Sequence, residues 1–148
     1  RITATGHDHH HEILATLQKL CAGVVKFQDP ASGLWYQVVD QGGRKGNYLE
    51  ATASCMFVYT MAKGMNRGYL TGDYKPAILK GYSGIVTNLI KTDGDKITLT
   101  QCCSVAGLGY GRDGSYEYYL KEPIVDNDLK GVGPFILAGI ELQKISCR

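Results

Sequence analysis

The stretch YLEATASCMFVYTMAKGM, residues 48–65, decides the fold class of this chain because it has the length and the pattern of a helix. Its apolar face follows the 3.6-residue helical period and consists of Leu49, Ala53, Met56, Phe57, Thr60 and Met61. Residues 51–55 are all small, so a second helix or a ligand can approach this helix closely. Gly64 and Gly68 lie where a C-cap would end it.

Three more helices are expected along the chain. The first runs from about residue 11 to residue 27 and ends at an Asp-Pro pair, because proline disfavours helical backbone in the residue that precedes it. The third runs from about residue 74 to residue 91, with Asp73 as its N-cap. The last starts near Val132 and has Pro134 in its first turn, where the missing N–H is harmless. The fold class is therefore all-α.

Long connections separate these helices. Residues 34–39 and 96–100 have the composition of short strands, and the tyrosine-rich residues 116–120 are read as a strand after the glycine-rich loop 107–114. Roughly 40 residues separate the third helix from the last, and loops of that length usually carry function. The chain is therefore expected to be a sector of a larger helical barrel, with short β-hairpins in its loops.

Composition limits the class of partner. The 148 residues suffice for one domain with a core, and 44% hydrophobic against 20% charged residues indicate a globular chain. A net charge of +2 argues against nucleic acid or an anionic membrane as a partner. No apolar run approaches the ~20 residues of a membrane span, and a signal peptide is either absent or removed. The 19 glycines and 10 tyrosines favour a polar cavity lined by loops.

The cysteines and histidines indicate no metal site and no cofactor. The five cysteines are odd in number, show no Cys-x-x-Cys spacing and are expected to be reduced, which favours a cytoplasmic location with the periplasm as the alternative. His7 and His11 have an i, i+4 spacing, but no second ligand group with metal-site spacing occurs elsewhere. Residues 7–11 are therefore interpreted as a solvated helix start or a tag-like sequence.

Four segments carry a resemblance to a known family. They are residues 28–38 (QDPASGLWYQV), 46–54 (GNYLEATAS), 112–119 (RDGSYEYY) and 127–135 (NDLKGVGPF). In this order and at this spacing they resemble the C-terminal part of unsaturated rhamnogalacturonyl hydrolases, glycoside hydrolase family 105. More distantly they resemble unsaturated glucuronyl hydrolases, family 88. The resemblance covers nearly everything from Ile13 to Leu142.

The resemblance implies an (α/α)6 barrel, six helical hairpins around a cavity. Residues 1–148 are then a C-terminal portion of a single barrel domain, with about four of its helices. It also implies removal of a 4,5-unsaturated uronic acid from lyase-generated pectin oligosaccharides, by hydration of the double bond with an aspartate as general acid and base. In the family that aspartate belongs to earlier hairpins, so no catalytic residue is assigned here. The expected partners are the oligosaccharide and the remainder of the barrel, or a second copy through self-association.

The first two motifs supply four binding candidates, three of which have two interpretations. Trp35, the only tryptophan, either stacks on a sugar ring or anchors its loop to the barrel. Tyr48 lies at a helix start that the resemblance places at the cavity mouth. Glu50 is interpreted mainly as a helix-capping residue, with sugar contact as the minor alternative. Ser54 is interpreted mainly as a small residue that permits close packing, with cavity lining as the alternative.

The last two motifs supply five further candidates. Arg112 can bind a uronate carboxylate through two parallel hydrogen bonds, or pair with a nearby surface acid. Tyr118 is interpreted as a strand residue that faces either the core or the cavity. Asp128, Lys130 and Gly131 precede the last helix, whose N-terminal N–H groups suit a carboxylate. The alternative is a tight loop in which the glycine only permits the turn.

Two other functions stay open. The missing acid motivates a non-catalytic helical module that binds carbohydrate or another protein. A different toroid enzyme, such as an epimerase or mannosidase relative, should carry paired carboxylates or histidines at its cavity, and this sequence shows none convincingly. Turnover of an unsaturated uronide separates the hydrolase from the binding module.

Overall fold

The computed structural model describes residues 6–146, and within that range the chain forms five α-helices, one 3-10 helix and four short strands. In chain order the elements are α1 (His10–Lys26), α2 (Ala51–Asn66), η1 (Gly72–Tyr74), α3 (Lys75–Asn88), β1 (Ile90–Asp93), β2 (Lys96–Leu99), β3 (Cys102–Cys103), α4 (Tyr116–Lys121), β4 (Ile124–Val125) and α5 (Leu129–Ser146). The strands form two antiparallel pairs, β1 with β2 and β3 with β4. The chain is therefore helix-rich, as expected.

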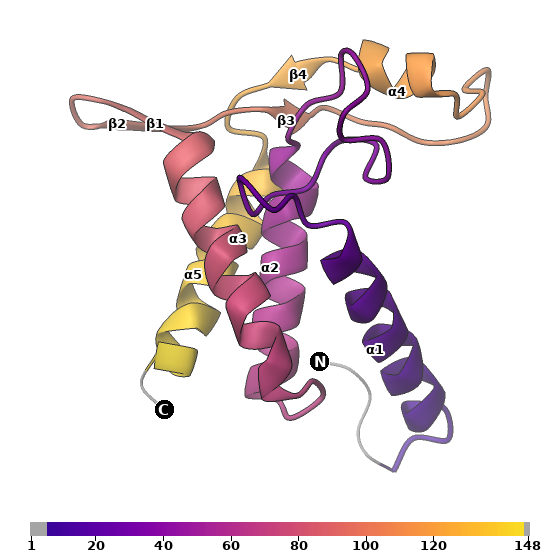
Figure 1. Cartoon of the computed structure of the whole chain (residues 1–148), viewed down its shortest axis with the longest axis vertical. Coiled ribbons are helices and arrows are strands. Elements are labelled where there is room, and N and C mark those ends of the chain that lie inside the picture. The colour runs from indigo at the N-terminus through magenta and orange to yellow at the C-terminus, as the bar shows by residue number, and fades with distance from the viewer. Residues whose placement is uncertain (1–5, 147–148) are drawn as a thin grey trace.

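The four long helices run in alternating directions, and most of the remaining structure collects at one end of them (Figure 1). α1 and α3 run toward that end, and α2 and α5 run away from it. The connections 27–50 and 89–128 lie there with both strand pairs and α4, and we call this part the loop end. At the opposite end, only residues 67–74 join α2 to α3. We therefore expect functional side chains to lie at the loop end.

α2 is the central helix, because it packs against α1, α3 and α5 and makes its broadest contact with α5. α2 and α5 are parallel. Thr52 lies beside Gly131 near their N-termini, and the Asn66 amide donates to the carbonyl oxygen of Glu141 at 2.9 Å near their C-termini. A Cβ atom at Gly131 would lie 3.0 Å from the sulfur of Cys102 and 3.3 Å from the hydroxyl oxygen of Thr52. The small residues of both helices thus allow this close contact.

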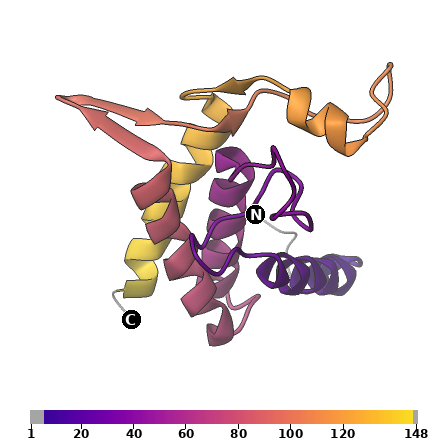
Figure 2. The same cartoon turned by 45° about the horizontal axis from the view of Figure 1, so that its top comes forward.

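The core lies along α2. Its fully buried apolar side chains on α2 are Ala51, Cys55, Val58, Met61 and Ala62. They meet Ile78 and Ile85 from α3, Ala138 and Ile145 from α5, and Leu34 and Trp35 from the loop end. α1 adds Cys21 as its buried apolar residue and lies apart from the other helices in both views (Figures 1 and 2). The helix α1 is therefore the most loosely attached of the four.

Apolar side chains stay exposed on both sides of the helix row. On α1 and at its C-cap these are Ile13, Leu20 and Phe27, which recur every seven residues. On α5 they are Leu129, Ile136, Leu137 and Ile140. Apolar stripes at helical spacing normally face another element of structure. The row of helices is thus open at both sides.

Four predictions in the first two thirds of the chain can be compared with the structure. The second helix begins later than expected because Glu50 occupies its N-cap position. Asp73 does not cap the third helix, since it lies in η1. Residues 34–39 contribute a single bridge rather than a strand, whereas the predicted strand at 96–100 is confirmed as β2.

Two predictions near the C-terminus are wrong. Residues 116–121 form the helix α4 rather than a strand, because the Ser115 hydroxyl accepts a backbone hydrogen bond at 3.1 Å and caps the helix. α5 begins at Leu129, earlier than expected, since the Asp128 carboxylate accepts a hydrogen bond from a first-turn N–H at 2.8 Å. Pro134 therefore lies inside the helix and not in its first turn.

A tight turn at the start of the loop end holds Trp35 in the core. The Asp29 carboxylate accepts hydrogen bonds from the N–H of Ser32 at 2.7 Å and from its hydroxyl at 2.6 Å. These bonds hold the pKa of the Asp29 carboxyl below its ordinary value. Gly33 completes the turn with a φ of 75°, in the left-handed region that suits glycine. The turn delivers Leu34 and Trp35 to the core.

We expect Gly84→Ala to lower the free energy of unfolding by about 3 kcal/mol, because the new methyl group would collide with the backbone carbonyl of Ser32. Gly23→Ala is the matched control, since nothing lies within 4 Å of a Cβ atom there. That change should stabilise the chain by about 0.5–1 kcal/mol through helix propensity. Urea denaturation measures both values, and equal midpoints for the two variants would contradict the packing described.

Stability should also depend on the ionisation of Asp29. Because the folded state lowers the pKa of this carboxyl, its contribution is present above the unfolded value, near 3.8, and is lost as pH falls through the folded pKa. Asp29→Asn should therefore flatten the rise of melting temperature with pH between about pH 3 and pH 5. Asp95→Asn, in an exposed turn, is the control and should retain the slope of the parent.

Candidate functional site

Two adjoining cavities lie at the loop end, next to the N-termini of α2 and α5. The inner cavity, about 290 Å³, is lined by Gln37, Glu50, Thr52, Ala53, Met56, Cys103, Ser104, Val105, Ala106, Tyr119 and Lys130. The outer cavity, about 310 Å³, is lined by Gln37, Val38, Val39, Asp40, Gln41, Gly114, Tyr116 and Tyr119. Gln37 and Tyr119 line both, so the two cavities are neighbours across these side chains.

Glu50 joins two elements of the inner cavity. Its carboxylate accepts hydrogen bonds from the N–H groups of Thr52 at 2.9 Å, Ala53 at 2.5 Å and Cys103 at 2.9 Å. The side chain is buried, and these three donors together with the helix N-terminus stabilise its charge. The capping interpretation of Glu50 is confirmed, and the same carboxylate ties β3 to the start of α2.

Cys103 and Thr52 line the inner cavity, whereas the neighbouring Cys102 and Tyr48 are not part of its lining. The Gln37 amide donates a hydrogen bond to the sulfur of Cys103 at 3.2 Å. Burial raises the pKa of the Cys102 and Cys103 thiols and of the Tyr48 phenol. The hydroxyls of Tyr48 and Thr52 are buried and interact with the thiols of Cys103 and Cys102, respectively. A buried thiol with a raised pKa is a poor nucleophile, so we interpret Cys103 as part of the cavity wall.

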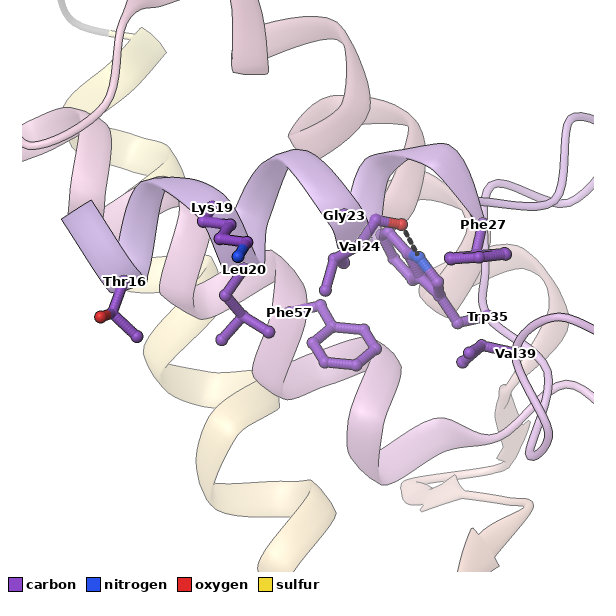
Figure 3. A pocket seen from close by; sticks show the side chains of 9 residues that line it. All are labelled: Thr16, Lys19, Leu20, Gly23, Val24, Phe27, Trp35, Val39 and Phe57. Atoms are coloured by element: carbon purple, nitrogen blue, oxygen red, sulfur yellow. Dashed lines mark hydrogen bonds between the residues drawn. The ribbon is translucent and has the colours of Figure 1, made fainter. Parts of the chain in front are cut away.

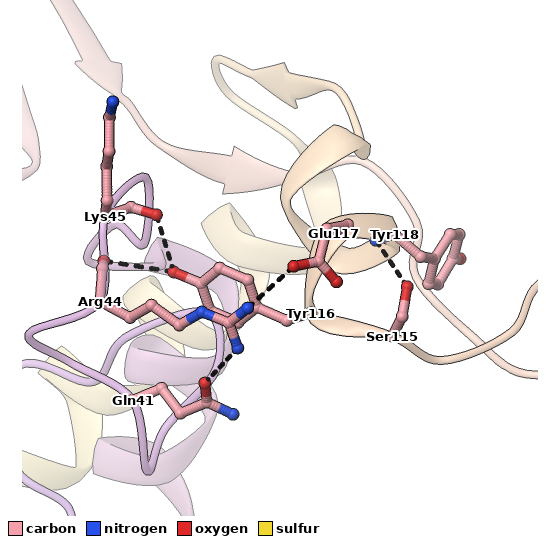
Figure 4. Close-up of polar contacts among 7 residues, drawn as sticks. All are labelled: Gln41, Arg44, Lys45, Ser115, Tyr116, Glu117 and Tyr118. Carbon is pink, nitrogen blue, oxygen red and sulfur yellow. Dashed lines mark hydrogen bonds and ion pairs between the residues drawn. The ribbon is translucent and has the colours of Figure 1, made fainter.

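An arginine clamp holds α4 against the connection between α1 and α2 (Figure 4). The Arg44 guanidinium lies over the Tyr116 ring, 3.6 Å from its centroid, and pairs with the Glu117 carboxylate at 2.8 Å. The Tyr116 hydroxyl donates to the carbonyl oxygens of Arg44 at 3.2 Å and Lys45 at 3.1 Å. Gln41 accepts another Arg44 hydrogen bond at 2.8 Å. The clamp thereby positions the α4 wall of the outer cavity.

Lys130 is a predicted site residue that reaches the inner cavity. Lys130 and Gly131 lie inside α5 and not before it, which corrects their expected place. The Lys130 ammonium pairs with the Asp128 carboxylate at 2.7 Å, and hydrogen bonds from Lys130 hold the pKa of Asp128 below its ordinary value. Gly131 faces Cys102 and α2, so it serves the contact between the two helices.

Arg112 and Tyr118 line neither cavity. Arg112 exchanges backbone hydrogen bonds with Gly109, and the Tyr118 hydroxyl accepts one from the N–H of Gly107 at 3.1 Å. Both residues therefore hold the glycine-rich loop in place. The strand interpretation of Tyr118 is wrong because it lies on α4, where its neighbour Tyr119 reaches the cavities instead.

Trp35 has the geometry of a packing anchor. It is fully buried, its ring lies edge-to-face with Phe57 at a centroid distance of 5.3 Å, and its Nε1 donates to the carbonyl oxygen of Val24 at 2.8 Å (Figure 3). Its backbone N–H donates to the Ser54 hydroxyl at 3.2 Å, so Ser54 also serves packing. Trp35 and Phe57 line an apolar groove of about 540 Å³ along α1, which we call the α1 groove.

The sequence analysis did not identify Gln37 and Tyr119, the two residues that line both cavities. Ser115 followed by an acidic residue is a helix-start signal, and it would have placed Tyr116 and Tyr119 on one helical face. Those two tyrosines line the outer cavity. No sequence signal singles out Gln37, because its position depends on the turn at residues 29–34 and on the backbone hydrogen bond from its N–H to Tyr48.

Among residues 6–146, no group of three or more His, Cys, Asp or Glu side chains is arranged to hold a metal ion. His9 lies 3.3 Å from the carboxylate of Glu12. Four cysteines are free and buried, and Cys147 lies outside the described residues. Within the same range, every helix is too short or too polar to cross a membrane.

The helix arrangement matches that of glycoside hydrolases whose fold is an α/α toroid. It matches a family 105 glycoside hydrolase from C. acetobutylicum ATCC 824 with a TM-score of 0.90 and 43% identity, over 95% of this chain and 40% of that one. A family 88 glycosyl hydrolase from Bacteroides vulgatus shares the fold, with a TM-score of 0.69 and 19% identity over 93% of this chain and 36% of that one.

Residues 2–146 match Glycosyl Hydrolase Family 88, and the chain belongs to this family. The 24.9 kDa protein in the picA locus of Rhizobium radiobacter is 39% identical over an alignment of 140 positions, which covers 88% of this chain and 59% of that protein. A protein of Agrobacterium fabrum shows the same identity and coverage, so the chain spans 59% of the length of these curated relatives. The resemblance carried by the four sequence motifs is confirmed.

We expect Glu50→Gln to lower the free energy of unfolding by about 1–3 kcal/mol, since an amide cannot satisfy three N–H donors and places its own donor against one of them. Glu12→Gln is the matched control, because that side chain is 78% exposed and should change stability by less than about 0.5 kcal/mol. Denaturation curves compare the two, and a Glu50 variant as stable as the control would show that the cap is dispensable.

Proposed function

We propose that this chain is part of a glycoside hydrolase that removes a 4,5-unsaturated uronic acid from lyase-generated oligosaccharides of the pectin or rhamnogalacturonan type. The observation that carries the proposal is the inner cavity at the starts of α2 and α5 in a member of family 88. Lys130 supplies a cation for a carboxylate, Gln37 and Ser104 supply hydrogen bonds, and Tyr119 supplies an aromatic face. Few polar groups on a partly apolar wall are typical of ligand sites.

The proposed reaction adds water to the double bond of the uronate. A general acid protonates one carbon of the bond, the hydroxyl group of water adds to the other, and the remaining proton of water returns to the acid. The hydrated sugar then opens and releases the next sugar. We assign the acid to an aspartate in another part of the toroid. In this chain Lys130 binds the uronate carboxylate, and Asp128 positions the Lys130 ammonium.

Tyr48, Tyr118 and Gly131 are proposed to stabilise the structure around the site. Tyr48 is half-buried beside Glu50, Tyr118 holds the glycine-rich loop, and Gly131 lets α5 approach α2. Arg112 lies in the same loop and is exposed. It therefore stays a candidate for an anionic sugar beyond the described cavities.

The other helices of the toroid are the proposed partner. They would cover the α1 groove and the exposed stripe of α5, which lie on opposite sides of the row. The greater length of the curated and solved relatives supports this proposal. Produced without those helices, the chain is expected to self-associate through the same surfaces. The buried free thiols support a reducing compartment, and we propose the cytoplasm.

A non-catalytic carbohydrate-binding module is the second candidate, and one observation favours it. The carboxylates that line the two cavities are Glu50 and Asp40. Glu50 already accepts three backbone hydrogen bonds, so neither cavity presents a pair of free carboxylates for proton transfer. Binding of unsaturated and saturated uronides without turnover would favour the module.

The proposed hydrolase is tested with an unsaturated rhamnogalacturonan disaccharide and the protein expressed from its complete native gene. Turnover should remove the ultraviolet absorbance of the unsaturated uronide. Lys130→Ala should raise KM about tenfold, because a charge-assisted contact to the carboxylate is lost. Lys96→Ala, in the exposed β1–β2 hairpin, is the control and should leave KM unchanged. A protein inactive on every unsaturated uronide would refute the proposal.

A further inference from the structure

We propose that the β1–β2 hairpin is a dimerisation element and that its β1 edge pairs with the β1 edge of a second copy of this chain. The hairpin projects beyond the helices in both views (Figures 1 and 2). Its sheet has two strands, so each strand keeps one edge without a neighbouring strand among residues 6–146. Two strands alone are marginally stable in water, and an open edge is a template for a further strand.

The backbone groups of Thr92 point away from β2. Just before the ladder begins, the N–H of Thr100 donates to the carbonyl oxygen of Leu89 at 2.8 Å. Hydrogen-bonded and non-bonded pairs alternate along an antiparallel ladder, so Lys91 and Asp93 carry the hydrogen bonds to β2. The N–H and carbonyl of Thr92 therefore face outward, where an antiparallel β1 strand of a second copy can exchange hydrogen bonds with them.

The corresponding edge of β2 is already occupied. The N–H of Leu99 donates to the Asn127 side chain at 2.8 Å, and its carbonyl oxygen accepts from the N–H of Asn127 at 2.8 Å. Leu99 faces Ile90 in the ladder, so these bonds confirm that this pair turns its backbone groups outward. Along β1, no hydrogen bond from another part of residues 6–146 reaches the outward groups of Ile90 and Thr92. The free edge is therefore that of β1.

The charges of β1 are self-complementary. When two β1 strands pair antiparallel about a two-fold axis through Thr92, Lys91 of each copy lies opposite Asp93 of the other. Both side chains are exposed and form no ion pair among residues 6–146. Facing opposite charges stabilise an antiparallel pair, whereas facing like charges destabilise it. A lysine on an edge strand usually opposes self-pairing, but here Asp93 of the second copy offsets its charge.

The other face of the hairpin also suits a wider sheet. Thr92 faces Ile97 across the hairpin, and the Ile97 side chain is 64% exposed. Pairing through β1 would place both residues and their copies in one row of four β-branched side chains across four strands. Such side chains pack well on a pleated surface, and a four-stranded sheet has the size that an isolated hairpin lacks.

Cross-linking tests the register in the protein expressed from its complete native gene. Thr92→Cys places two thiols opposite each other, with Cα atoms about 5.5 Å apart, within the range of a disulfide. Ile97→Cys is the matched control, because it is exposed on the same face but its two copies lie about 14 Å apart. After oxidation with diamide, Thr92→Cys should run mainly as a covalent dimer on a non-reducing gel, and the control mainly as a monomer.

Charge reversal tests the same pairing in solution. Lys91→Glu and Asp93→Lys each turn both attractive pairs into repulsive ones and should weaken dimerisation about tenfold. An equimolar mixture of the two variants should recover dimerisation, because every facing pair again has opposite charges. Asp95→Lys, in the hairpin turn, is the control and should dimerise as the parent does. Sedimentation over a series of concentrations measures each Kd.

Two results overturn this inference. One is a parent that stays monomeric at its highest soluble concentration and whose Thr92→Cys variant forms no more covalent dimer than the control. The other is a dimer that neither charge reversal nor mixing alters, because it then forms through another surface, such as the α1 groove. Neither result bears on the proposed hydrolase activity, on which the dimer does not depend.

Discussion

The buried carboxylate of Glu50 is the interaction on which the candidate site depends. It accepts hydrogen bonds from two N–H groups of α2 and from the N–H of Cys103 in β3, which is far away in sequence. A buried charge is tolerated only when such donors surround it, so the start of α2 and the position of β3 are fixed together. β3 pairs with β4, and β4 directly precedes α5. The position of β3 therefore also fixes the walls of the inner cavity.

The parallel contact between α2 and α5 places the N-termini of both helices at the same end of the molecule. Both helix starts, with Glu50 at one and Asp128 at the other, lie at the loop end, where the long connections of the chain also meet. The rest of the row is open, since α1 keeps its groove and α5 keeps its apolar stripe. The architecture thus combines a site fixed by buried hydrogen bonds with two open flanks, and the solved relative that it matches is longer.

Much of the fold could be predicted from the sequence, and most of the site could not. Helical periodicity located the four long helices, because the apolar face of residues 48–65 and its counterparts reflect local burial. The errors occurred where a side-chain cap decides the structure, as Ser115 does for α4 and Asp128 for α5. Gln37 was missed because long-range contacts place it in the cavities, whereas Tyr119 was missed because the helix start at Ser115 was not recognised.

Burial of the native thiols has a practical consequence for experiments. Cys21, Cys55, Cys102 and Cys103 are buried with raised pKa values, so maleimide reagents, which attack the thiolate, should spare them while the chain is folded. Local opening of an element exposes its sulfur and allows labelling. These four atoms are therefore built-in reporters of fluctuation, with one in α1, one in α2 and two in β3 beside the cavity.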